Sequence, residues 1–455
     1  MKMDLVIANG KVVDFNKSEL VEKNIGIKNG KIHSLTSADI SGQTVLDAAG
    51  SVVSPGFIDI HNHSDYNFNV GAKDPFETAK HLLLMGVTTS IGGNCGSGRT
   101  DIETYFDYIE KNGAPNNYLG FVGHRKLREE VGITDVYRAA KNTEIKKMQE
   151  LAKKAVENGA VGISFGLEYS PGASFEELVE VGRVLREYPN TLLSAHYRYD
   201  ADRSLEALEE LIELSKETGV PMQVSHLNSG ICFGYAREGL EMLETAYRQG
   251  LDIMADAYPY SAFSTSAGSA VFDDGCLERW GVGYDSIMVA GGEHAGKRCD
   301  KQLFEHIRKT TPDIPFIAFV MKEEEVDRVI AHPLVMVGSD GNINDGHGHP
   351  RASGTFPRVL HRYAAGKGVE TLLLFLEKMT KLPAQRLGIK TKGDLFEGAD
   401  ADIVIFNKDN TKDNATFESP IERPSGIDYV LVGGKIAVDK GIIKKTDSGK
   451  VIKLK

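Results

Sequence analysis

Both ends of the chain alternate apolar and polar residues with a period of two, which is the pattern of half-buried β-strands. The runs with this pattern are residues 3–15 (MDLVIANGKVVDF), 24–35 (NIGIKNGKIHSL), 401–407 (ADIVIFN) and 427–441 (IDYVLVGGKIAVDKG). Two Asn-Gly pairs, beginning at Asn9 and Asn29, interrupt the first two runs and predict hairpin turns. A sheet built from both termini would form one small domain that flanks the rest of the chain.

The middle of the chain alternates short apolar runs with segments of helical periodicity. Eight runs have the length and composition of buried strands: SVVSPGFIDI (51–60), GVTTSIGG (86–93), YLGFVG (118–123), AVGISFG (160–166), TLLSAH (191–196), PMQVSH (221–226), LDIMADA (251–257) and LVMVGSD (334–340). Between them, residues 144–159 and 203–219 repeat apolar positions at spacings of three and four, as amphipathic helices do. Eight strands, each followed by helical sequence, favour a (β/α)₈ barrel over an open doubly wound sheet.

This order of elements predicts an α/β protein, a (β/α)₈ TIM-type barrel with a small β-sandwich domain formed by both chain ends. We expect residues 1–54 and 386–455 to form the sandwich and residues 55–385 to form the barrel. The connection after the seventh strand, about residues 258–331, is far longer than the others. A connection of that length is usually functional or has its own structure, so we expect an insertion that covers the site or selects the substrate.

Composition argues against several classes of function. The 455 residues are 41% hydrophobic and 26% charged, as in ordinary soluble globular proteins. The net charge is −11 and the basic residues are scattered, which argues against a nucleic-acid or anionic-membrane partner. The first residues lack the apolar core of a signal peptide, and no run reaches the roughly 18 apolar residues of a membrane span. Four cysteines are too few for a disulfide framework, so the sequence favours a cytoplasmic protein, of unspecified oligomeric state.

Side chains that bind metals stand at the ends of several predicted strands, where barrel enzymes carry their catalytic groups. They are His61 and His63 after the first strand, Cys95 after the second, His196 in the fifth, His226 in the sixth and Asp340 in the eighth. Taken singly, such a histidine or cysteine is more often structural, and Asp340 could cap a helix. Six of them at one end of one barrel favour a metal site, because imidazole, thiolate and carboxylate together suit Zn²⁺.

The motifs around these residues resemble a known family. PGFIDIHNH (55–63), the mid-chain histidines and the late SDG are similar to the amidohydrolase superfamily. More motifs are similar to the D-aminoacylases, the N-acyl-D-amino-acid deacylases: GVTTSIGGNCG, GLEYSPG, MQVSHLNSG, DAYPYS, HPRASGTFPRVL, GADADIVIF and ATFESPIERPSGI. The resemblance covers essentially the whole chain. The cysteine of GNCG is its most specific element, because many relatives use a carbamylated lysine to bridge their metals.

The resemblance implies a zinc-dependent hydrolase that acts on a small N-acylated molecule. It also implies two metal positions and one catalytic acid and base. One zinc would be held tightly by Cys95, His196 and His226, and a second, weaker position would involve His61, His63 and Asp340, with Asp340 as the acid and base.

The resemblance further implies residues that contact the substrate. Tyr258, in the YPY motif, and Arg351, in HPR, would hold the substrate carboxylate, while Tyr169 and Arg198 would lie near the pocket. The family usually carries a lysine two residues after the histidine of the sixth strand, where this chain has Asn228. An asparagine donates a hydrogen bond but carries no charge, so this departure would weaken the binding of a free carboxylate.

Zinc chemistry accounts for the expected reaction. The ion lowers the pKa of a bound water from about 15.7 to about 7 and polarises a carbonyl, and a neighbouring carboxylate moves the water proton to the leaving amine. This chemistry fits the reaction that the resemblance implies, deacylation of an N-acyl-D-amino acid to a carboxylate and a free D-amino acid. The alternatives are a hydantoinase-like or dihydroorotase-like cyclic-amide hydrolase, a deacylase of another N-acylated amine, a deaminase and a non-enzymatic relative. A deaminase would need an additional glutamate and histidine pair without a clear match here, and the full ligand set argues against a protein without chemistry.

Overall fold

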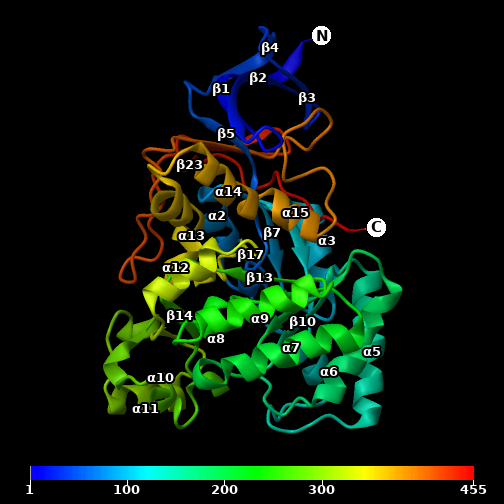
Figure 1. Ribbon diagram of the computed structural model, residues 1–455, viewed down its shortest axis with the longest axis vertical. Coiled ribbons are helices and arrows are strands. Elements are labelled where there is room, and N and C mark those ends of the chain that lie inside the picture. The colour runs from blue at the N-terminus through cyan, green and yellow to red at the C-terminus, as the bar shows by residue number, and fades with distance from the viewer. Residues whose placement is uncertain (1, 455) are drawn as a thin grey trace.

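The computed structural model describes residues 2–454 (Figure 1). The N-terminal strands, in blue, lie at one pole of the molecule, and C-terminal segments, in orange and red, lie next to them. The alternating strands and helices of the middle of the chain fill the remainder. The two ends of the chain therefore meet in space, as the matching patterns at the termini predict.

Both chain ends pair in one nine-stranded sheet. The strands run in the order β23-β22-β21-β20-β5-β1-β2-β3, and β4 pairs with β1. Their bounds are β1 (Met3–Asp14), β2 (Glu19–Lys28), β3 (Lys31–Thr36), β4 (Gly42–Asp47), β5 (Val52–Pro55), β20 (Ile403–Phe406), β21 (Ile427–Val432), β22 (Lys435–Asp439) and β23 (Ile442–Ile443). Side chains from both ends of the chain, among them Ile7, Ile25 and Ile403, are buried in one shared core.

One of the two predicted Asn-Gly hairpin turns is wrong. Asn29 and Gly30 do connect β2 to β3, with φ angles of 51° and 73°, as a tight hairpin requires. Asn9 and Gly10 instead lie inside the continuous strand β1, where the register to β2 shifts between Ile7 and Gly10. Asn9 has a φ of 56°. An Asn-Gly pair supplies the left-handed residue of a β-bulge as readily as that of a turn, and here it forms the bulge.

The eight predicted strands of the middle region are all present, and they pair in parallel in two sheets, β6-β7-β8 and β9-β10-β11-β12-β13-β17. The first predicted run divides between β5 and β6, and the third between β8 and β9. The strand bounds are β6 (Phe57–Asp59), β7 (Val87–Gly92), β8 (Asn117–Gly120), β9 (Val122–Gly123), β10 (Gly162–Gly166), β11 (Leu192–His196), β12 (Met222–Val224), β13 (Ile253–Ala257) and β17 (Val335–Val337).

The two parallel sheets meet at both of their outer edges. Only Phe121 separates β8 from β9, so the chain passes directly from one sheet to the other. At the opposite edges, the backbone N–H of Asp340 donates to the carbonyl of His61 at 2.7 Å, and that of His63 donates to Gly341 at 3.0 Å. These bonds tie β6 to β17 just beyond their carboxyl ends, where three of the predicted site residues lie.

Helices follow the parallel strands along the chain, and the two segments predicted to be helical form α5 and α7. The helix bounds are α1 (Tyr66–Asn69), α2 (Glu77–Leu84), α3 (Ile102–Asn112), α4 (His124–Glu130), α5 (Asn142–Glu157), α6 (Phe175–Gly182), α7 (Ser204–Thr218), α8 (Asn228–Ile231), α9 (Ala236–Arg248), α12 (Glu323–Ala331), α13 (Arg351–Val359), α14 (Val369–Met379) and α15 (Lys381–Arg386). Gly219, with a φ of 64°, ends α7 as a left-handed cap. Within residues 2–454, no helix has the length and apolar character needed to cross a membrane.

The long connection after β13 has its own structure. It contains an antiparallel sheet, β14-β16-β15, and the helices α10, α11 and α12. Their bounds are β14 (Ala262–Ser266), α10 (Cys276–Trp280), β15 (Ile287–Val289), α11 (Lys301–Thr310) and β16 (Pro315–Phe319). The helix α12 forms the end of the predicted insertion and packs on β17 and α9. A short hairpin, β18 (Ile343–Asn344) and β19 (His347–Gly348), follows β17.

A buried ion pair joins the terminal sheet to the parallel strands. Lys392 pairs with Asp402 and lies 3.1 Å from Oδ2 of Asp400, measured from Nζ. The carboxylate of Asp402 also accepts hydrogen bonds from Nδ2 of Asn117 in β8, at 3.0 Å, and from the backbone N–H of Gly433, at 2.7 Å. The side chains of Lys392 and Asp402 are each only 5% exposed, so the lysine compensates a charge that solvent does not reach.

We expect Lys392→Met to destabilise the protein strongly, because it leaves the buried carboxylate of Asp402 without a counter-charge. Breaking one partner of a buried pair typically costs about 3–5 kcal/mol. Denaturant unfolding followed by circular dichroism measures the effect. Lys408→Met is the control, because Lys408 pairs with Asp409 at the surface, where substitutions change stability by about 0.5 kcal/mol or less. Adding Asp402→Asn to Lys392→Met should restore part of the loss, and equal unfolding midpoints for the two lysine variants would contradict the prediction.

Candidate metal centre and pocket

The six residues predicted to bind metal lie together at the carboxyl ends of the parallel strands. His61 and His63 follow β6, Cys95 follows β7, His196 ends β11, His226 follows β12 and Asp340 follows β17. All are buried except His63, which is partly exposed. We refer to these six residues as the metal cluster. Strands of one parallel sheet present their carboxyl ends on the same side, so the convergence follows from the fold.

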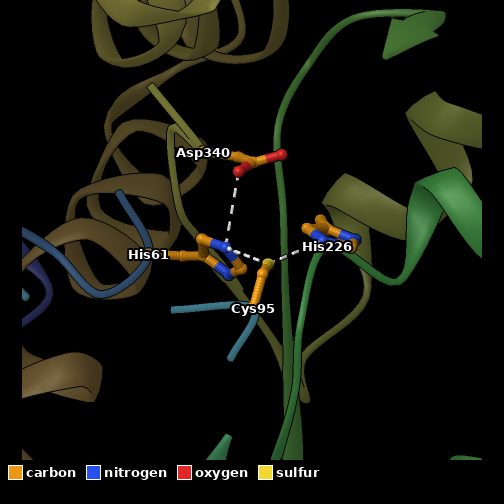
Figure 2. Close-up of side chains that lie close together, drawn as sticks. All are labelled: His61, Cys95, His226 and Asp340. Carbon is orange, nitrogen blue, oxygen red and sulfur yellow. Dashed lines mark hydrogen bonds and ion pairs between the residues drawn. The ribbon is translucent and has the colours of Figure 1, made fainter. Parts of the chain in front are cut away.

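Four members of the metal cluster place one ligand atom each within 4.8 Å of one another: His61, Cys95, His226 and Asp340 (Figure 2). Sγ of Cys95 lies 3.4 Å from Nε2 of His61 and 3.4 Å from Nε2 of His226. Oδ1 of Asp340 lies 3.4 Å from Nε2 of His61. Ligand atoms bound tetrahedrally to zinc at 2.0–2.3 Å are separated by about 3.3–3.7 Å. These separations therefore suit the ligand atoms of bound metal.

The other two members of the metal cluster lie beside these four. Nε2 of His63 is 3.0 Å from Oδ1 of Asp340. The ring centre of His196 is 4.6 Å from that of His226, and its Nε2 is 2.9 Å from Oε2 of Glu168. Nδ1 of His196 is buried and has no hydrogen-bond partner within residues 2–454. A buried nitrogen without a partner is a ligand atom available to an ion.

Three residues of the metal cluster have backbone angles that most side chains avoid. The φ angle is 53° at Cys95, 32° at His226 and 49° at Asp340. A non-glycine residue in this region costs about 1–3 kcal/mol and persists where the surrounding structure enforces it, often at functional sites. The backbone around Cys95 is also closely packed, because a Cβ added at Gly166 would lie 2.2 Å from the Cys95 carbonyl oxygen.

Carboxylates and a hydroxyl behind the cluster orient its histidines. Oδ1 of Asp256, which precedes the last residue of β13, lies 3.0 Å from Nδ1 of His61 and accepts a hydrogen bond from the backbone N–H of His226 at 2.8 Å. The hydroxyl of Ser229 lies 2.8 Å from Nδ1 of His226. These contacts direct the Nε2 atoms toward Cys95, which is how outer partners fix metal-binding histidines.

The sequence analysis missed Asp256, Ser229 and Glu168. Asp256 stands at the end of a predicted strand, in LDIMADA, so the rule that found the metal cluster could have found it too. Ser229 and Glu168 lie in the connections after β12 and β10, where the sequence carries no comparable signal.

Charged neighbours shift the pKa values within the cluster. Burial alone would raise the pKa of the Cys95 thiol, but His61 and His226 outweigh it and hold that pKa well below its usual range. Burial would likewise raise the pKa of Asp340, and Arg351 and His226 together bring it well below the ordinary value. Thiolate and carboxylate are the forms that bind metal, so the charges and distances of the cluster fit a divalent cation.

A small pocket opens beside the cluster. It is lined by Glu168, Tyr169, His196, Tyr197, Asp200, His226, Ser229, Tyr258, Phe263, Ser264, Thr265, Val271 and Asp340. Phe263, Ser264, Thr265 and Val271 belong to the long insertion, so the insertion contributes one part of the pocket wall, as expected from its length.

Three of the five predicted substrate contacts lie at this pocket. Tyr169 and Tyr258 line it, and the Tyr258 hydroxyl is buried without a hydrogen-bond partner in residues 2–454. Nη1 of Arg351 lies 2.9 Å from Oδ2 of Asp340, its Nη2 donates to the carbonyl of Ser264 at 3.2 Å, and its guanidinium carbon is 4.6 Å from the ring centre of Tyr258. The guanidinium is thus adjacent to both the cluster and the pocket.

The other two predicted substrate contacts are engaged elsewhere. Nδ2 of Asn228 donates to Sδ of Met321 at 3.8 Å, and its Oδ1 accepts the backbone N–H of Tyr258 at 3.4 Å. Arg198 forms an ion pair with Glu210, at 2.8 Å, and donates to the carbonyl of Pro171 at 2.9 Å. Neither residue is part of the pocket lining, so a direct substrate contact of Arg198 receives no support from its position.

Comparisons with known proteins agree with the geometry. The sequence model of the amidohydrolase family matches residues 44–280 and 277–438. The chain is 34% identical to D-aminoacylase and 32% identical to N-acyl-D-glutamate deacylase, both from Alcaligenes xylosoxydans xylosoxydans; each alignment covers 95% of this chain and 93% of the relative. A structure of N-acyl-D-glutamate deacylase from Bordetella bronchiseptica with zinc and a phosphonate inhibitor superimposes with a TM-score of 0.87 at 30% identity, and covers 100% of both chains.

A second solved structure, of a D-aminoacylase with a binuclear metal centre, superimposes with a TM-score of 0.86 at 31% identity and covers 99% of this chain and 100% of that one. The similarity in sequence and in structure extends over nearly the whole chain, including the terminal sheet. The chain therefore belongs to the amidohydrolase family, where it groups with the D-aminoacylases, and it is an amide-hydrolysing enzyme.

Proposed function

We propose that this protein is a zinc-dependent deacylase that hydrolyses the linear amide of N-acyl-D-amino acids to a carboxylate and a free D-amino acid. The observation that carries the proposal is the position of Arg351 and Tyr258 beside the metal cluster. A guanidinium and a free hydroxyl next to a set of metal ligands suit a small substrate with a carboxylate near its scissile amide. The relatives with 30–34% identity are named for the same kind of substrate.

The residues that would hold the metal are those of the metal cluster. Cys95, His196 and His226 would bind the tighter zinc, and His61, His63 and Asp340 would form the weaker position. The thiolate supports zinc over magnesium or calcium, because hard cations take oxygen ligands. Bound zinc supplies Lewis-acid chemistry, by which it polarises a carbonyl and makes water nucleophilic near neutral pH.

Asp340 would be the group that moves protons. Its Oδ1 faces His61 and His63, and its Oδ2 faces Arg351. The depressed pKa keeps the carboxylate ionised at neutral pH, so it can accept the proton of the attacking water. Asp340 then donates that proton to the amide nitrogen, which would otherwise leave as a highly basic anion.

Arg351 and Tyr258 would position the substrate. The Arg351 guanidinium presents several donors, and the buried Tyr258 hydroxyl supplies one more, so together they can bind the two oxygens of a carboxylate. Asn228 contributes no positive charge, and its amide already contacts Met321 and the backbone of Tyr258. Binding of the substrate carboxylate would therefore depend on Arg351 more than it would with a lysine at position 228.

The strand pairing supports the finer fold prediction as well. The two parallel sheets, joined through Phe121 and through the bonds between β6 and β17, would form a closed (β/α)₈ barrel of residues 55–385. The terminal sheet, with a core shared by both chain ends, would form the β-sandwich of residues 1–54 and 386–455.

A substrate panel tests the proposal against its alternatives. The zinc-loaded protein should be assayed with N-acetyl-D-amino acids, their L-enantiomers, N-acetyl amines without a carboxylate, a hydantoin and dihydroorotate, with amine release or ring opening as the readout. We expect the D-compounds to have the highest kcat/KM. Higher activity on a cyclic amide would favour a hydantoinase-like enzyme, and higher activity on neutral amines would favour a different deacylase. Either result would replace the proposal.

The metal assignment predicts about one tightly held zinc per chain after purification without added metal. Cys95→Ala and His226→Ala should each lower the zinc content sharply, because one of three protein ligands is lost. Cys299→Ala is the matched control, since Cys299 is buried in the insertion and lies outside the metal cluster. Zinc content is measured by mass spectrometry of the folded protein, and wild-type levels in the Cys95 and His226 variants would refute the assignment.

The proton-transfer role predicts that Asp340→Asn retains the fold and the tighter zinc but loses hydrolysis. A general acid or base supplies roughly 10²–10⁴-fold, and loss of a metal ligand would deepen the decrease in kcat. Asn tolerates the φ of 49° at this position. Asp345→Asn is a matched control, because Asp345 is exposed on the same loop and has a φ of 50°. If Asp340→Asn stays within about tenfold of wild type, another group moves the proton.

The carboxylate-binding role predicts that Arg351→Met lowers kcat/KM at least tenfold on N-acyl amino acids, because a charge-assisted contact is worth roughly 1.5–3 kcal/mol. Arg351 also contacts Asp340, so N-acetyl amines without a carboxylate are the control substrates, and they should be affected less. Asn228→Lys should preserve or increase kcat/KM on N-acyl amino acids. Equal losses on both substrate classes would show that Arg351 serves only Asp340.

A further inference from the structure

We propose that the pocket selects substrates that carry a cationic group, an alkylammonium or guanidinium, and that the carboxylates of Glu168 and Asp200 bind it. This inference rests on the proposed deacylase function and names its substrate class. Glu168 follows β10 and Asp200 follows β11, and both line the pocket beside the metal cluster. We refer to these two carboxylates as the acidic wall.

The acidic wall contacts one arginine and one imidazole, because Nε2 of His196 lies 2.9 Å from Oε2 of Glu168. Nε of Arg279, in the insertion, lies 2.5 Å from Oδ1 of Asp200, and its Nη2 lies 3.7 Å from Oε1 of Glu168. Nε1 of Trp280 donates to Oδ2 of Asp200 at 2.6 Å. As a zinc ligand the His196 imidazole would be neutral. The Arg279 guanidinium would then compensate both carboxylates, at the longer distance to Glu168.

The pocket lining itself is acidic. Within residues 2–454 it includes the carboxylates of Glu168, Asp200 and Asp340 but no lysine or arginine. Asp340 has its own cation in Arg351, so the surplus of negative charge lies at the acidic wall. The side chains of Glu168 and Asp200 are 11% and 3% exposed. Water screens such charges weakly, and a substrate cation would gain more there than at the surface.

The titration of Asp200 is consistent with this surplus. Burial, and then the neighbouring Glu168, raise its pKa to about 7 even though Arg279 opposes the shift. Burial is the main cause of this shift, and the smaller contribution of Glu168 has the sign expected for two neighbouring carboxylates.

The rest of the pocket suits a cation on an alkyl stem. Phe263, Val271, Tyr169 and Tyr197 supply apolar surface around the acidic wall. An aminoalkyl or guanidinoalkyl chain could lie along this surface with its head at the carboxylates. The same wall would repel a second carboxylate, so acidic side chains of the glutamate or aspartate kind should be poor substrates.

The cation could belong to either half of the substrate, the amino-acid side chain or the acyl group. Two matched pairs separate these sources, because each replaces only an ammonium by a methyl group. The first pair is N-acetyl-D-lysine and N-acetyl-D-2-aminoheptanoate. The second is N-(β-alanyl)-D-norleucine and N-butanoyl-D-norleucine. N-acetyl-D-glutamate is the acidic comparison.

With the zinc-loaded full-length enzyme, we expect kcat/KM to be at least roughly tenfold higher for the ammonium member of one pair, the gain typical of a charge-assisted contact. The pair that shows the difference identifies the half of the substrate at the acidic wall. Ratios near one in both pairs, or N-acetyl-D-glutamate as the better substrate, would overturn the inference.

Two variants distinguish binding from a structural role, because they should move the ammonium-to-methyl ratio in opposite directions. Asp200→Asn keeps the acceptor for Trp280 and removes negative charge, so the ratio should fall severalfold. Arg279→Gln removes the competing cation, so the ratio should rise. Asp273→Asn is the matched control, because Asp273 pairs with Arg308 outside the pocket lining, and the ratio should not change. If Asp200→Asn and Arg279→Gln change the ammonium-to-methyl ratio in the same direction, the acidic wall does not bind the cation.

Failure of the inference and failure of the deacylase function give different results. If the compounds are hydrolysed with ratios near one, the deacylase function stands and the acidic wall does not bind the cation. If none is hydrolysed, the deacylase function fails, and calorimetric binding of the same intact compounds then tests the wall. At least roughly tenfold tighter binding of an ammonium member would support it, and equal affinities would overturn it.

Discussion

The structure depends on holding a thiolate and several carboxylates at strand ends that water hardly reaches. An isolated charge in such a place would cost several kcal/mol, so each one has a partner from another strand or loop. Cys95 lies between His61 and His226, and Asp340 lies between His63 and Arg351. The partners come from distant parts of the sequence, which means that the charges are stable only when the parallel strands are correctly assembled.

The same requirement explains the unusual backbone at the site. Cys95, His226 and Asp340 all have positive φ, and each angle turns a side chain inward just past a strand end. The hydrogen bonds from Asp340 to His61 and from His63 to Gly341 hold the turn at Asp340 while they join β6 to β17. The contacts between these two strands therefore also fix the position of one candidate ligand. A substitution that relaxed the backbone there would gain local stability at the expense of the ligand arrangement.

The sequence predicted the strands and helices, which follow periodic patterns. It did not predict the contacts that depend on loops distant in the sequence. Strand periodicity located all eight parallel strands, and the strand-end rule located the metal cluster. The hairpin turn predicted at Asn9 and Gly10 is instead a β-bulge, because both structures require a residue in the left-handed conformation. Glu168 and Ser229 were not predicted as site residues, because no local sequence pattern marks a residue that contacts a metal-binding histidine. Arg198 has a motif position that suggests a pocket contact, yet its ion pair with Glu210 holds it elsewhere.

Asn228 and Arg351 show how one substitution changes the demands on another residue. With no charge at position 228, Arg351 is the nearest guanidinium to Tyr258 and also the counter-ion of Asp340. A substrate carboxylate would therefore compete with Asp340 for the same guanidinium.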